Sequence, residues 1–152
     1  MIKINKADEV FSDFIRTRDN WECVRCLSLG KRSVFRPPQR LIRFFPQFED
    51  RTRNAMALHN MHCFSRGGYM LRFNPLDCLA GCYGCHSYLD RNPLEKYEFF
   101  KSQIGEEKFA EIKILSKQAL TGISKSELEE RVKKEFGIKF LELVATKGGG
   151  IL

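Results

Sequence analysis

The sequence contains no apolar run long enough to cross a bilayer, and its first residues lack a basic stretch followed by an apolar one. The first absence argues against a membrane-spanning helix, and the second argues against a secretory signal peptide. Internal repeats are absent as well. We therefore expect a cytoplasmic protein with no membrane partner.

The chain also has little material for a large core. Its 152 residues are 43% hydrophobic, which suggests one domain, or one domain with a helical extension. A core of this size often needs an additional staple, and a bound metal is one such staple. In a reducing compartment, the six cysteines are better interpreted as metal ligands than as disulfides.

Four of these cysteines form two CxxC pairs, Cys23/Cys26 and Cys82/Cys85. Two intervening residues let the chain turn so that both thiolates of a pair face one ion, and two pairs complete a tetrahedron. The pattern predicts a closed, structural Zn²⁺ site that joins distant segments. A redox CxxC and unrelated buried thiols are the alternatives. Cys63 and Cys78 have no such partner and are interpreted as core thiols.

Positive charge is unevenly distributed along the chain. The net charge is +7, and all of the excess except Lys147 lies in residues 1–92, which also carry the CxxC pairs. A basic segment of this kind is typical of a surface that binds nucleic-acid phosphates, although a generic basic protein would have one as well. Residues 27–54 are the most basic part, and phenylalanines alternate there with arginines. These rings either belong to a DNA-binding loop or pin the insertion to the core, and both can hold.

Helical patterns lie on both sides of the cysteine-bearing region. Residues 5–19 have apolar side chains at i, i+4 spacing, with Asn5 as the candidate N-cap. A short helix is predicted over 83–90. Further helices are predicted over 92–103, over 106–120 and from about Ser124 or Ser126 to about Val144, and each of these serines begins a possible capping box. Residues 148–152 are expected to fray.

Residues 55–73 are expected to form a hairpin around Gly67-Gly68. All three histidines of the chain are close to it in sequence: His59 and His62 lie on its first strand, and His86 follows the last zinc cysteine. Folding the hairpin back on the second CxxC pair would bring the histidines together. A histidine from a strand and one from a helix could then bind one ion.

The segments Leu58–Gly67 and Leu71–His86 resemble the phage NinG/Rap recombination nucleases, which are HNH (ββα-metal) enzymes similar to the endonuclease VII type. The stretch Phe14–Trp21 is similar too, and the resemblance covers roughly residues 10–120. It implies an α+β fold in which residues 1–92 form a small zinc-stapled ββα-metal core with an N-terminal helix and the basic insertion 27–54. Residues 93–147 would be an extension of about three helices that packs on the core or dimerises.

The resemblance further implies a metal-dependent DNA endonuclease. His62 would be the general base, and His86 would bind catalytic Mg²⁺ or Mn²⁺ together with His59 or Asp77. Asp77 stands where HNH proteins usually have asparagine, and Met61 stands where many have an acid or a histidine. Six arginines are candidates for phosphate contacts: Arg40, Arg43, Arg51, Arg53, Arg66 and Arg72.

The expected substrate is branched or four-way-junction DNA of phage recombination, cut in the host cytoplasm, and a homodimer would suit two incisions. The alternatives are a non-catalytic, zinc-stabilised DNA-binding module and a protein-interaction adaptor built on the neutral C-terminal helices. Cleavage that needs a divalent ion and His62 would distinguish the enzyme from the module.

Overall fold

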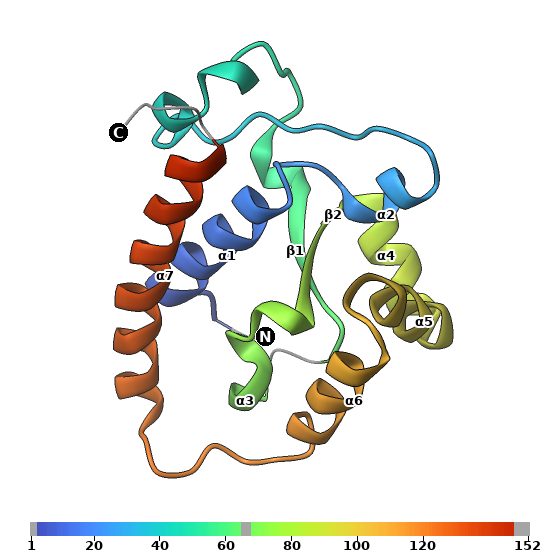
Figure 1. Ribbon diagram of the computed structural model, residues 1–152, viewed down its shortest axis with the longest axis vertical. Helices are drawn as coiled ribbons and strands as arrows, with labels where there is room; N and C mark the ends of the chain where they lie inside the picture. The colour runs from blue at the N-terminus through green and yellow to red at the C-terminus, as the bar shows by residue number, and fades with distance from the viewer. Residues whose placement is uncertain (1–2, 65–67, 148–152) are drawn as a thin grey trace.

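The computed structural model describes residues 3–64 and 68–147. It is an α+β structure, mostly helical, with a two-stranded antiparallel sheet near its centre (Figure 1). The predicted fraying tail, residues 148–152, lies outside the described residues. Within the described ranges, no helix combines the length and the apolarity that a bilayer crossing requires.

Helix α1 (Lys6–Arg18) confirms the prediction for residues 5–19. Asn5 caps it through a full capping box with Asp8, in which each side chain accepts a hydrogen bond from the other residue's backbone amide. Phe11 and Ile15 are buried on its apolar face. After α1 the chain turns sharply through Asn20 and Trp21, which both have positive φ, and this turn leads to the first cysteine pair.

The first CxxC pair lies at the start of the short helix α2 (Val24–Ser28). The basic insertion follows as irregular chain with two 3-10 turns, and a third 3-10 turn (Ala55–Ala57) leads into the sheet. The rings of Phe35 and Phe45 are buried against Trp21, and Phe44 and Phe48 are partly buried beside them. The phenylalanines therefore pin the insertion to the core, as one of the two sequence-based interpretations predicts.

The sheet pairs β1 (Leu58–His62) with β2 (Cys78–Cys82). The prediction that residues 69–73 form the partner strand of β1 is therefore wrong. Residues Tyr69–Arg72 form helix α3 instead. One reason is the Tyr69 ring, which stacks edge-on against Phe73 one turn away. β2 was difficult to recognise because it is buried on both faces and does not alternate apolar with polar residues. Gly67 of the predicted turn lies outside the described residues.

Helix α4 (Tyr83–Arg91) starts directly after β2, and α5 (Pro93–Ile104) ends at Gly105, which has φ +90°. Both helices agree with those predicted from the sequence. Helix α6 (Glu106–Leu115) is shorter than the predicted range 106–120, and Ala119 within that range lies outside the helix and is exposed. These three helices cover the face of the ribbon that carries Met61 and Leu79.

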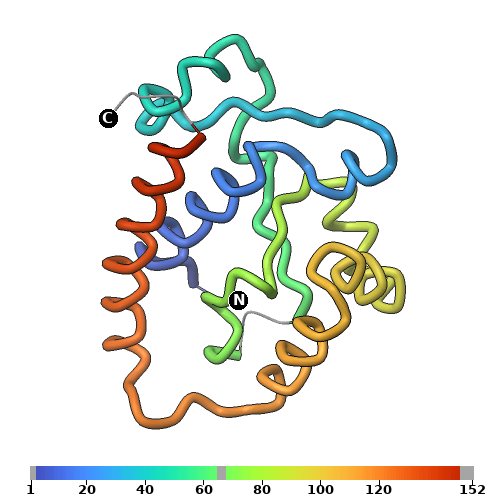
Figure 2. The backbone as a smooth tube through the Cα atoms, in the orientation of Figure 1, coloured from blue at the N-terminus to red at the C-terminus, as the bar shows by residue number. Residues whose placement is uncertain are grey.

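The long helix α7 (Lys125–Lys147) begins at Ser124, which forms a capping box with Glu127. It runs back beside α1, as the chain trace in Figure 2 shows. Phe136, near the middle of this helix, packs against Phe11 of α1. Phe140, one turn further along, contacts Phe45 of the insertion. The C-terminal extension is therefore joined to the N-terminal helix in one continuous structure.

Candidate functional site

The four predicted zinc cysteines converge at one point, with all four Sγ atoms within 4.8 Å of one another. Cys26 Sγ lies 3.9 Å from Cys82 Sγ and 3.6 Å from Cys85 Sγ. Thiolates bound at about 2.3 Å in a tetrahedron lie about 3.8 Å apart, so these two separations are close to those of ligands on one Zn²⁺. Four sulfur ligands close such a site, which makes it a structural one.

Local structure positions these thiols. Cys23 and Cys82 are the N-caps of α2 and α4, so each CxxC pair wraps the first turn of a short helix. The Cys26 amide donates to Cys23 Sγ at 3.4 Å, and Arg25 Nη1 donates to Cys85 Sγ at 3.7 Å. Burial raises the pKa of Cys26, but hydrogen bonds, led by one from Ser33, outweigh it and leave that pKa lowered. These donors offset part of the negative charge that four thiolates accumulate.

A pair of histidines lies beside the cluster, across the junction of the ribbon and α4. His59 Nδ1 and His86 Nδ1 are 3.0 Å apart. His86 Nε2 lies 3.3 Å from Asp90 Oδ2, one helical turn further along α4. Burial, and then the charge of Arg16, lower the pKa of His59, which favours the neutral imidazole. The structure thus brings together the strand histidine and the helix histidine that the sequence proposed as metal ligands.

This pair opens into a cavity of about 640 Å³ between β1, α4 and α1. The α1 side contributes Asp8, Ser12 and Arg16, which follow one another at i+4 spacing. Asn60 of β1 also lines it and donates from Nδ2 to Ser12 Oγ at 3.3 Å. This polar stripe is not among the residues predicted from the sequence, although its regular spacing on α1, on a side different from that of the apolar residues, is a usable signal.

His62 lies apart from this pair. Successive side chains alternate between the two faces of a strand, so His62, three residues after His59, faces the opposite side of β1. There its ligand atom lies within 4.8 Å of those of Asp77 and Cys78. The sequence offered Asp77 as a metal ligand beside His86. Among the described residues, the structure instead places Asp77 next to His62.

Asp77 is fully buried, and its Oδ1 accepts a hydrogen bond of 2.9 Å from the Phe64 amide. This bond holds the chain directly after β1. Burial raises the pKa of Asp77 to about 7 against the opposing effect of that amide. The thiol of Cys78 is also buried, as the sequence predicts for this residue and for Cys63.

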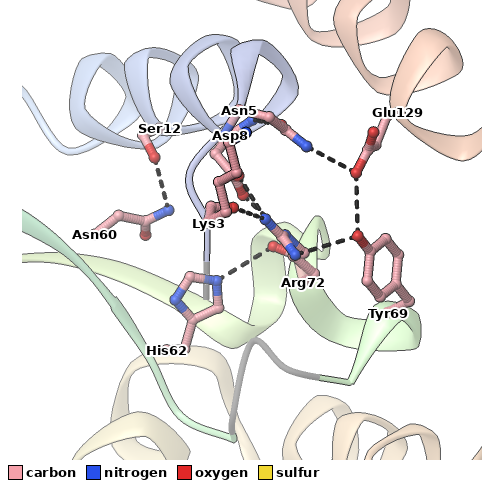
Figure 3. Close-up of polar contacts among 9 residues, drawn as sticks. All are labelled: Lys3, Asn5, Asp8, Ser12, Asn60, His62, Tyr69, Arg72 and Glu129. Carbon is pink, nitrogen blue, oxygen red and sulfur yellow. Dashed lines mark hydrogen bonds and ion pairs between the residues drawn. The ribbon is translucent and has the colours of Figure 1, made fainter. Parts of the chain in front are cut away.

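The predicted phosphate contact at Arg72 is wrong (Figure 3). The Arg72 side chain is 5% exposed, and its guanidinium donates to both carboxylate oxygens of Asp8, at 2.9 and 2.6 Å. It also donates to the Lys3 carbonyl and to Tyr69 Oη. A guanidinium held in this way anchors α3 to α1 and has no surface left for DNA.

The other candidate arginines differ in their surroundings. Arg40 pairs with Asp13 at 2.6 Å, and Arg51 donates to three backbone carbonyls, so both help to hold the insertion. Arg43 and Arg53 are exposed and lie over the rings of Phe44 and Phe35. Arg66 lies outside the described residues. Three of the five candidate arginines that the structure describes, Arg40, Arg43 and Arg53, therefore combine exposure with a fixed position.

No protein-family model, no curated protein and no solved structure matches this chain. The fold and site define an α+β protein with a four-cysteine cluster, consistent with a zinc site, beside a two-stranded ribbon.

Proposed function

We propose that this protein is a metal-dependent DNA endonuclease that hydrolyses phosphodiester bonds. The observation that carries the proposal is the 3.0 Å approach of His59 Nδ1 and His86 Nδ1 at a cavity, on a ribbon and helix held by the four-cysteine cluster. Two nitrogen ligands at about 2.1 Å from one ion, at a right angle to each other, lie about 3.0 Å apart. The pair thus has the spacing of two adjacent ligands in octahedral coordination.

His59 and His86 are proposed to hold Mg²⁺ or Mn²⁺, which when bound supplies charge stabilisation to the scissile phosphate and the leaving oxygen. Two protein ligands leave positions for substrate and water. Asp90, beside the second nitrogen of His86, orients that ring. Arg16 lines the same cavity and offers a positive charge to a phosphate, whereas Lys6, which also lines it, is paired with Glu9 at 2.8 Å.

His62 is proposed as the general base. Its Nε2 lies 3.2 Å from the Arg72 carbonyl oxygen, which can only accept a hydrogen bond. The ring proton is therefore on Nε2, and the basic lone pair is on Nδ1. Because His62 faces the other side of β1 from the His59–His86 pair, this role requires the substrate to reach both faces of the strand, and the His62→Ala variant tests it separately from the metal-binding pair.

The decisive experiment is a cleavage assay on duplex, nicked, flap and four-way-junction DNA with Mg²⁺, Mn²⁺ or EDTA. We expect metal-dependent cleavage, with junction preference as the resemblance implies. His59→Ala and His86→Ala should lose both Mn²⁺ binding, measured by electron paramagnetic resonance, and cleavage. Asp90→Asn should weaken Mn²⁺ binding by roughly 10–100-fold.

His62→Ala should abolish cleavage while leaving Mn²⁺ binding, zinc content and DNA binding intact. Full cleavage by this variant would remove His62 from the mechanism. Wild-type protein that binds all four DNAs and cuts none would reject the enzyme.

That last outcome would favour a zinc-stabilised DNA-binding module. The observation favouring this second candidate is the pair of exposed arginines, Arg43 and Arg53, fixed over aromatic rings of the insertion. If they contact phosphates, replacing either by glutamine should weaken binding to all sequences and reduce the slope of log K against log salt by about 1. Light scattering would show whether the protein is a dimer.

A further inference from the structure

A second cluster of metal-binding side chains lies on the opposite face of the ribbon from the histidine pair. His62 and Cys78 are directly opposite each other in the β1–β2 register, so their side chains share one face. Asp77 precedes Cys78 at the end of a 3-10 turn. One imidazole nitrogen, one carboxylate oxygen and one thiol sulfur all lie within 4.8 Å of one another.

Asp77 gives an independent reason to expect a ligand here. The residue is 0% exposed, and while Oδ1 accepts the Phe64 amide, Oδ2 is buried with no hydrogen-bond partner among the described residues. A buried carboxylate oxygen without a partner is costly, and the cost is removed by a proton or a bound cation. A histidine and a cysteine within ligand distance make a cation possible at this position.

We propose that His62, Asp77 and Cys78 form a second transition-metal site, for Zn²⁺ or a similar ion, separate from the four-cysteine cluster. Nitrogen, oxygen and sulfur donors together suit Zn²⁺ and Co²⁺, whereas a thiolate ligand does not suit Mg²⁺. Three protein ligands leave a fourth tetrahedral position for water or another exogenous ligand.

The surroundings of the cluster are those of a supported metal site. His62 donates from Nε2 to the Arg72 carbonyl, and a ligating histidine commonly donates its second nitrogen in this way. The buried ion pair between Arg72 and Asp8 fixes that carbonyl in turn. The Phe64 amide orients the Asp77 carboxylate. Each of these contacts reduces the reorganisation that metal binding would require.

The site has a consequence that rests on the proposed function. An ion on His62 would occupy the lone pair that a general base needs. Zn²⁺ at this site should therefore inhibit cleavage, and a chelator weak enough to leave the four-cysteine zinc in place should restore it.

Cobalt titration of the zinc-loaded protein, without DNA, tests the site independently of any cleavage activity. We expect one further equivalent of Co²⁺ to give a sulfur-to-cobalt charge-transfer band, while the protein keeps its one equivalent of zinc. Binding at the His59–His86 pair would give no such band, because it contains no thiolate. A wild-type protein without the band, at constant zinc content, would overturn the proposal.

Variants identify the ligands. Asp77→Asn keeps an acceptor for the Phe64 amide, and Cys78→Ser is nearly isosteric, so both should fold and lose the band. Cys63→Ser, at a buried thiol outside the cluster, is the control that should keep it. If the two buried variants do not fold, His62→Ala decides, since His62 is partly exposed: an unchanged band in that variant would refute the site.

Discussion

The buried ion pair between Arg72 and Asp8 allows a sharp test of whether this arginine is structural. Arg72 makes two charge-assisted hydrogen bonds to the Asp8 carboxylate and is almost completely removed from solvent. Replacing it with methionine would leave a buried carboxylate without its main counter-charge. Breaking such a pair from one side costs about 3–5 kcal/mol, which in a protein of this size lowers the melting temperature by roughly 10 °C.

The measurement is urea and thermal unfolding followed by circular dichroism, with zinc present throughout. Arg43→Met is the matched control, because that arginine is exposed and lies over the Phe44 ring, so its loss should cost no more than about 1 kcal/mol. DNA affinity of Arg72→Met should be unchanged at temperatures where the variant is folded.

A double-mutant cycle separates the pair from other effects. Asp8→Leu alone should also destabilise, partly through loss of the capping box with Asn5. The double variant should be more stable than the sum of the single effects predicts, by on the order of 3 kcal/mol. Additive effects, or a loss below about 1 kcal/mol for Arg72→Met, would refute the reasoning.

Three further predictions concern packing and the zinc site. Gly81→Ala should cost about 1–3 kcal/mol because its new Cβ would lie 2.3 Å from the buried Met61 Sδ, whereas Gly84→Ala, with open space on α4, should be neutral or stabilising in the same unfolding assay. Phe140→Ala should cost about 3–5 kcal/mol by removing the ring that joins α7 to the insertion. Cys82→Ser, or strong chelation of the wild type, should release zinc by elemental analysis and unfold the ribbon and α4 together; folded, zinc-free protein would contradict the staple.

The two CxxC pairs were the most predictable part of the site, because their spacing constrains metal geometry whatever lies between them. Helices α1, α5 and α7 were also predictable. Their caps and stops are local signals: Asn5 and Ser124 begin helices by bonding amides within one turn, and Gly105 ends one by adopting positive φ.

The local sequence does not decide which segment pairs with β1. Residues 69–73 and 78–82 are both short, apolar and next to turn residues, and only the hairpin with 69–73 is predicted from the sequence. Long-range contacts decided otherwise: Arg72 reaches Asp8, 64 residues away, and this contact requires α3 to pack against α1. β2 pairs with β1 because its small buried residues admit the Met61 side chain over Gly81.

The same distinction applies to the histidines. The sequence by itself determined which residues can act as metal ligands, because imidazoles, thiols and CxxC spacing are properties of the chain. Only the tertiary structure decided their grouping, since the pleat of β1 turns His59 toward His86 and His62 toward Asp77 and Cys78. Side-chain direction on a strand depends on register, and register depends on which distant segment becomes its partner.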